Sequence, residues 1–200
     1  MTSTIKFDKW ENTANTKSVT MDQIAGGSGL VPVLPTSIGV QTGSASVGAN
    51  GVVSFSGATA VELNNCFSSE YRNYKFIVNV SVSNSPSWYR YRANGANLTT
   101  SDYFDVGIQA YYDGAPATIS SRSQNIGYPL YLVGTQCLWT GEISSPYVSA
   151  PTRMISEGTR DNSGFFRTAQ SVYNVNTIAD GISFIFENVA TGTVQVYGYR

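Results

Sequence analysis

The chain has 200 residues, a formal net charge of −1 and only 12% charged residues. This length suits one all-β domain with a short additional segment. The nearly neutral composition excludes charge-driven binding to nucleic acid or to an anionic membrane surface. The sequence has no histidine, which removes Ser-His-Asp and Cys-His nucleophilic catalysis and histidine-ligated zinc or iron. We therefore expect a non-enzymatic protein with no cofactor and no metal.

The first segment, residues 1–25, is expected to be a docking peptide. Residues 4–10 alternate briefly, which predicts a short strand added to a partner's sheet edge, and residues 18–25 predict a short helix that ends at two glycines. Neither piece is stable alone in water. The apolar side chains that we expect to bury against another protein are Ile5, Phe7 and Trp10.

No apolar run in the first 17 residues has the length of a signal peptide, and no later run is long enough to span a bilayer. We therefore expect synthesis in a cytoplasm. The two cysteines, Cys66 and Cys137, belong to no metal-ligand pattern, and two buried free thiols are favoured over a disulfide between them.

Residues 26–50 are rich in glycine, proline and serine, which is typical of a linker. Gly26 to Gly29 form a flexible joint, Pro32 and Pro35 stiffen the segment after it, and a second run of small residues follows from Gly43. We expect the folded head domain to occupy residues 51–200.

The organising stretch of the head is residues 67–95. From Tyr74 to Val82 every second residue is apolar, which predicts a strand with one buried face. Residues 83–86 (Ser-Asn-Ser-Pro) interrupt the pattern with turn-forming residues, and Trp88 to Arg92 alternate again, so we predict a hairpin.

Strand patterns continue through the rest of the head, with little sign of helix. Residues 103–112 place Phe104, Val106, Ile108 and Ala110 on one face, and residues 113–125 are predicted to be a loop. Near the end, residues 182–186 and 193–199 predict two strands joined by a loop at 188–192. Eight to ten such strands favour an all-β fold, a jelly-roll-like antiparallel β-sandwich, with an up-and-down barrel as the alternative.

Several strands carry aromatic residues on both faces, although a single sandwich has only one inside. We expect part of this second set to face sister subunits or a receptor, and a homotrimer is the favoured closed arrangement. The candidate residues for these contacts are Trp88, Tyr89, Tyr91, Tyr197 and Tyr199.

No residue spacing identifies an active site or an ion site. Paired carboxylates serve glycoside cleavage, but four acidic residues of the second half (Glu142, Glu157, Asp161 and Asp180) show no recognisable pairing. A second hypothesis is that Asp102, Asp105 and Asp113 bind a single calcium ion, although no EF-hand pattern is present.

Two segments carry a resemblance to a known class of proteins. They are residues 5–13 (IKFDKWENT) and residues 60–74 (AVELNNCFSSEYRNY), the latter continuing into residues 90–95 (RYRANG). They resemble virion structural proteins, often tail fibre proteins, of tailed phages that infect aquatic bacteria such as cyanobacteria. The chain departs from long fibres in having no coiled-coil heptads, no collagen-like triplets and no repeat array.

The resemblance implies an N-terminal peptide that docks on another virion protein (a tail hub, an adaptor or the major capsid protein) and a projecting, usually trimeric β domain. The leading expectation is a short tail fibre or knob located on the virion, with a host surface glycan as a further candidate partner. A capsid decoration protein is the alternative. A carbohydrate-active enzyme is a distant third.

Overall fold

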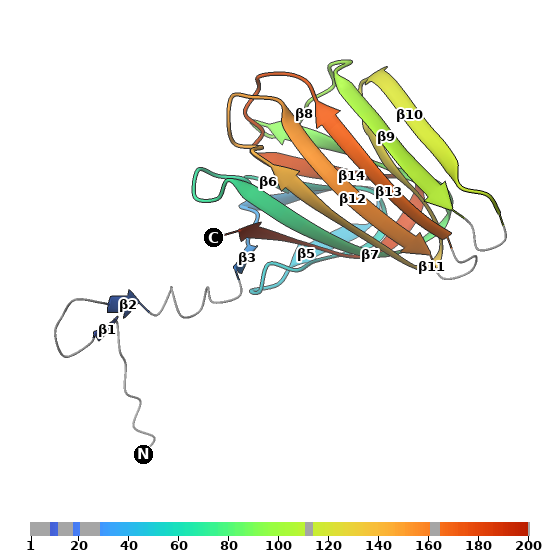
Figure 1. The fold of residues 1–200 in the computed structure, drawn as a ribbon. Coiled ribbons are helices and arrows are strands. Elements are labelled where there is room, and N and C mark those ends of the chain that lie inside the picture. The colour runs from blue at the N-terminus through green and yellow to red at the C-terminus, as the bar shows by residue number, and fades with distance from the viewer. Residues whose placement is uncertain (1–8, 12–17, 21–28, 111–113, 161–164, 200) are drawn as a thin grey trace.

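The computed structural model describes residues 9–11, 18–20, 29–110, 114–160 and 165–199 (Figure 1). Among these residues there is no helix, and hence none long and apolar enough to cross a membrane. The strands are β1 (Lys9–Glu11), β2 (Ser18–Thr20), β3 (Leu30–Val33), β4 (Ser37–Gln41), β5 (Ser44–Val47), β6 (Val53–Asn64), β7 (Asn73–Ala93), β8 (Ala96–Asn97), β9 (Tyr103–Ala110), β10 (Ala117–Gln124), β11 (Gly127–Ser144), β12 (Thr152–Arg160), β13 (Phe165–Tyr173) and β14 (Gly181–Tyr199).

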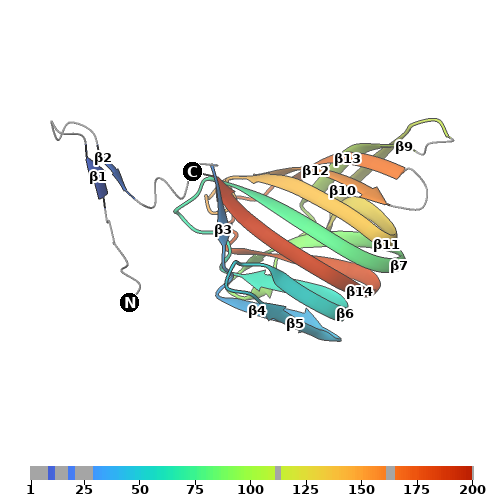
Figure 2. The same ribbon diagram turned by 90° about the horizontal axis from the view of Figure 1, so that it is seen from below.

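Twelve of these strands form one antiparallel sheet in the order β10-β9-β13-β12-β11-β7-β14-β6-β4, and β3, β5 and β8 pair at its margins. Figure 2 shows β11, β7, β14, β6 and β4 side by side along one curved surface. The pairing is antiparallel throughout, so the predicted all-β, jelly-roll-like antiparallel sandwich is confirmed.

The sheet becomes a sandwich because its four longest strands, β6, β7, β11 and β14, cross from one layer to the other. Their ladders shift register at neighbouring positions: Val82 of β7 pairs with both Gly134 and Ala190, and Ala190 pairs with Ala58. In β6 the bend falls at Gly57, whose φ of 64° is accessible mainly to glycine. Bulges and register shifts bend strands, and here they line up. We call the row formed by Ala58, Val82, Gly134 and Ala190 the fold line.

The fold line divides the sheet into two layers. Layer A contains β9, β10, β12, β13, the first halves of β6 and β7 and the second halves of β11 and β14, together with β3 and β5. Layer B contains the remaining halves of these long strands, with β4 and β8.

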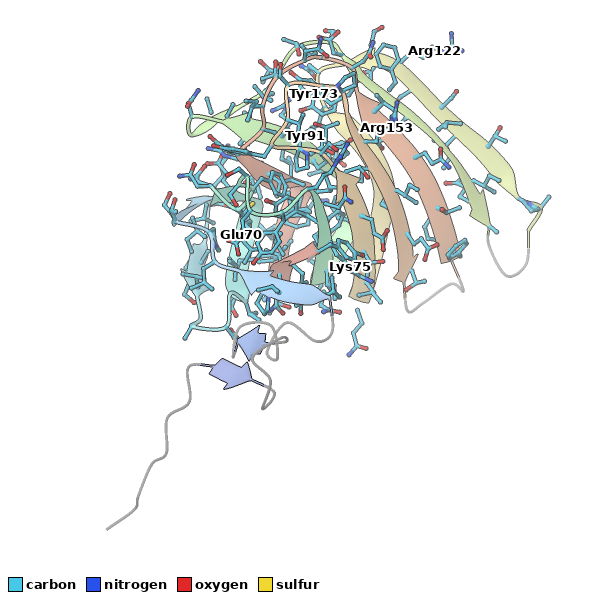
Figure 3. All side chains as sticks on the ribbon, turned by 60° about the vertical axis from the view of Figure 1, so that its left-hand side comes forward. Glu70, Lys75, Tyr91, Arg122, Arg153 and Tyr173 are labelled. Carbon is cyan, nitrogen blue, oxygen red and sulfur yellow. The ribbon has the colours of Figure 1, made fainter. Side chains whose placement is uncertain are left out.

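Aromatic rings from the two layers meet in the core. Trp139 and Phe76 of layer A lie edge-to-face against Phe184 of layer B, each with ring centroids 5.2 Å apart. Tyr91 of layer B packs on Tyr173 of layer A, at 5.9 Å, and Figure 3 shows these two side chains inside the sandwich. Such pairs add to the free energy gained by burying apolar area.

Part of the outer face of layer B is covered by the turn that follows β7. Arg92 is buried there, with its guanidinium 3.0 Å from the Glu62 carboxylate, and it donates to the side-chain oxygens of Asn64 and Asn97. A buried charge requires this full set of partners. The turn that follows β7 is thereby held over layer B.

Three segments have a different structure from the one predicted. Residues 30–47 are not a linker, because β3, β4 and β5 pair with β14 and β6. The predicted loop at 113–125 contains strand β10. Residues 18–20 form a strand paired with β1, not the start of a helix, because a hairpin pairs the backbone groups of both short segments.

The predicted hairpin of residues 67–95 is also wrong, because β7 is one continuous strand of 21 residues. Residues 83–86 mark its passage across the fold line. The predicted loop at 188–192 is the same feature in β14. In β7 the buried positions change from even to odd numbers across the bend, which keeps both halves facing one interior.

Candidate functional site

Strand β9 has its apolar side turned away from the core. Tyr103 and Asp105 point inward and are 0% and 5% exposed, whereas Val106 and Ile108 are 58% and 52% exposed. The sequence predicted that Val106 and Ile108 share a face, and the structure places that face outside. Large apolar side chains gathered on a surface mark contact sites.

A polar network inside the sandwich fixes this orientation. The Asp105 carboxylate accepts hydrogen bonds from the hydroxyls of Ser121, at 2.8 Å, and Ser171. The Tyr103 hydroxyl accepts from the backbone N–H of Tyr91, at 3.0 Å. Turning β9 over would leave these buried groups without hydrogen-bond partners, and each unsatisfied buried group costs free energy.

Neighbouring strands extend the exposed surface. Ile155 of β12 and Phe166 of β13 are 54% and 42% exposed. A shallow groove of about 380 Å³ runs over β9, β13 and β10 beside Val106 and Ile108. We call Val106, Ile108, Ile155 and Phe166 the apolar face. On β12, exposed Arg153 and Glu157 stand on either side of Ile155, so both signs of charge border the apolar face.

A second surface feature lies at the fold line, on the outer side of layer A. It is a groove of about 690 Å³ across β12, β11, β7 and β14. Leu138 lies in it and is 41% exposed. The polar side chains that line the groove are uncharged: Asn79, Ser81, Gln136, Thr159, Thr191 and Thr193. We call it the fold-line groove.

Gly192 lines the fold-line groove at a close approach of β14 to β7. A Cβ at this position would lie 2.1 Å from the carbonyl oxygen of Asn79 and 2.9 Å from the Cα of Val80, so no side chain fits where β14 approaches β7. Glycine in a strand commonly marks such a close approach.

The aromatic residues predicted to face a partner divide into two groups. Tyr89 and Tyr91 are 0% exposed, so the prediction that they contact a subunit or receptor is wrong, because both complete the core. Trp88, Tyr197 and Tyr199 are partly buried. The hydroxyl of Tyr199 donates to Glu142 at 2.7 Å, and burial together with this carboxylate raises the pKa of Tyr199 to about 12.

The predicted docking residues are largely beyond the described structure. Ile5 and Phe7 lie outside the described residues. The backbone of Trp10 belongs to β1 and is paired with Val19 of β2. Trp10 therefore sits in a hairpin within its own chain, and its role in docking stays a prediction.

Two of the four candidate catalytic acids come together. Glu142 and Glu157 lie on adjacent strands and line one pocket of about 290 Å³ with Lys75. Asp180 lies elsewhere, where its carboxylate accepts from the backbone N–H of Asn94 at 2.8 Å. Asp161 lies outside the described residues.

The calcium reading gains no support from the geometry. Asp105 is turned inward on its two serine partners, and Asp113 lies outside the described residues. Within the described parts of the chain, no three His, Cys, Asp or Glu side chains gather as metal ligands would.

The two cysteines are buried free thiols, as predicted. Burial raises the pKa of Cys66 to about 12, because a thiolate inside the sandwich would lose its hydration. A thiol held in this way is a poor nucleophile and metal ligand.

We expect stability to fall at alkaline pH. Burial raises the pKa of Tyr89, Tyr91 and Tyr103 above the ordinary value of 10.0, so the folded state keeps protons that the unfolded chain releases. The stabilising contribution is complete below about pH 10 and is lost above it, by up to about 1.4 kcal/mol per pH unit for each tyrosine. Guanidinium unfolding at a series of pH values measures this slope. Tyr91→Phe should reduce it, and an unchanged stability from about pH 9 to 11 would contradict it.

The sequence matches no protein-family model, and no curated protein matches it. Among solved structures, peanut lectin with a nine-residue peptide (PVIWSSATG) is similar over 82% of this chain and 93% of the lectin chain, with 8% sequence identity and a TM-score of 0.28.

Proposed function

We propose that this chain is a non-enzymatic structural protein of a tailed-phage virion. Its sandwich domain is a head that associates with sister copies, as a homotrimer, and faces the host surface. The N-terminal segment, with Ile5, Phe7 and Trp10, docks the head on another virion protein. The protein is made in the host cytoplasm and assembled on the particle.

The outward apolar side of β9 is the observation that carries the proposal. Val106 and Ile108 alternate as strongly as core residues do, yet they lie outside. Phe166 of β13 pairs with Ala110 of β9, and Ile155 of β12 lies in one row with Val106, with Gln170 of β13 between them. An apolar surface of this kind is stabilised only when another surface covers it. A covering partner that is always present at synthesis is a second copy of the chain.

The charges beside the apolar face support the proposal that a copy of this chain, and not a different protein, covers it. Arg153 and Glu157 flank Ile155, so the face is neutral overall and offers both signs to a neighbour. Interfaces of complementary charge exclude wrong partners through like-charge repulsion.

The alternative is a capsid decoration protein, with the same docking segment and the same self-association. Counting copies of the chain in purified particles by quantitative mass spectrometry tests both. A tail fibre or knob should be present in tens of copies per particle, and a shell decoration in hundreds. A particle that contains none of the chain would overturn the virion assignment.

One arrangement favours the third candidate, a carbohydrate-active enzyme. Glu142 and Glu157 share a pocket, as paired catalytic carboxylates do. Release of reducing ends from host polysaccharide by the purified chain, abolished in Glu157→Gln, would replace the structural role with this activity.

A further inference from the structure

We propose that the fold-line groove binds a neutral oligosaccharide. The inference rests on the proposed function, because it gives the head that faces the host a ligand class and a place to bind it.

The lining of the groove suits a ligand rich in hydroxyl groups. Thr159, Thr191, Thr193 and Ser81 offer hydroxyls that both donate and accept, and Asn79 and Gln136 offer amide groups with two donors and an acceptor. Sugar hydroxyls need this mixture of donors and acceptors, because each is itself both. Six such side chains converge from four strands.

The same lining excludes the main competing ligand classes. None of the ten residues that line the groove is Asp, Glu, Lys or Arg, so phosphate or a nucleic-acid backbone finds no charged partner there. An extended peptide normally binds by adding a strand to a sheet edge. This groove instead lies on the face of strands that are already paired on both sides.

Apolar surface lies beside the polar groups. Leu138 is exposed within the groove. Binding sites combine apolar walls with a few placed polar groups, and the C–H faces of a sugar ring can pack on the Leu138 side chain. The volume of about 690 Å³ lies within the usual range of ligand sites, about 300–1,000 Å³.

The groove and the apolar face are adjacent but separate surfaces. The groove extends from β12 toward β14, whereas the apolar face extends from β12 toward β9. Covering the apolar face with a sister copy leaves β7 and β14 free to take a ligand.

The test uses the full chain with defined tetrasaccharides: maltotetraose, cellotetraose and chitotetraose as neutral probes, and tetragalacturonate as a charged comparison. Saturation-transfer NMR and calorimetry should detect binding of at least one neutral probe, with weaker binding of tetragalacturonate. Asn79→Ala and Thr193→Val should each lower the affinity about tenfold, as expected for one lost hydrogen bond. Thr159→Val, which keeps the side-chain shape, is the third variant and lies on the opposite rim of the groove.

The control variants are Gln41→Ala on β4 and Ser46→Ala on β5, two exposed residues outside both the groove and the apolar face. They should bind as the parent chain does, and thermal melting should show every variant folded. Absence of binding to all three neutral probes, or equal binding by the groove variants and the parent, overturns the groove assignment. Neither result affects the copy number in particles, so failure here is distinguishable from failure of the virion proposal.

Discussion

Replacing Trp139 by alanine is expected to lower the free energy of unfolding by about 3–5 kcal/mol, the usual cost of removing a buried aromatic side chain. Trp139 is 0% exposed and packs on Phe76 at 5.0 Å and on Phe184 at 5.2 Å. Its ring therefore joins the two layers. Removing it leaves a cavity at their contact, and the paired strands on either side cannot collapse into that cavity. Guanidinium unfolding followed by tryptophan and tyrosine fluorescence measures the loss.

Leu138→Ala is the matched control, because Leu138 is the next residue of β11 and points to the opposite side. Its side chain is 41% exposed, so truncation should cost less than about 1 kcal/mol. Equal effects at the two positions would mean that the strand faces were assigned the wrong way round.

Replacing Val106 and Ile108 together by glutamate is expected to convert the proposed homotrimer into folded monomers. Both side chains lie on the apolar face, and an association that buries two unpaired carboxylates costs several kcal/mol for each charge. In the monomer both positions are exposed to water, so the unfolding midpoint of the domain should change little. Multi-angle light scattering after size exclusion gives the mass, and circular dichroism reports the fold.

Val189→Glu is the control for this experiment. Val189 is 58% exposed, as Val106 is, but it lies at the bend of β14 and not on the apolar face. It should leave the mass of the assembly unchanged. If Val189→Glu dissociated the assembly as well, the contact between copies would not be specific to the apolar face.

The strand patterns could be predicted from the sequence because the two-residue period is local. The alternation over Tyr74–Val82 corresponds to the first half of β7, and the predicted strand at residues 193–199 corresponds to the end of β14. The fold class follows from these strands and their turn residues.

The fold line could not be predicted because a bend and a turn use the same residues. The alternation is interrupted by Ser-Asn-Ser-Pro at residues 83–86 and by glycine at residue 57. Such residues occur both where a chain reverses direction and where a strand bends into the other layer. Only pairing with distant segments, such as Val82 with Ala190, decides between the two.

The candidate site was missed for a related reason. Asn79, Thr159 and Thr193 are far apart in the sequence and meet through long-range register between β7, β12 and β14. The alternation of β9 was visible in the sequence, but alternation does not say which side is the inside. The buried network of Asp105 decides it, and that network also depends on register with β10 and β13.

The mass of the full-length chain in solution tests the central claim most directly. If sister copies cover the apolar face, sedimentation equilibrium at micromolar concentration should give three times the 21.5-kDa chain mass. A species of 21.5 kDa that stays monodisperse over this range would contradict the account, because Val106 and Ile108 would then face water with no partner.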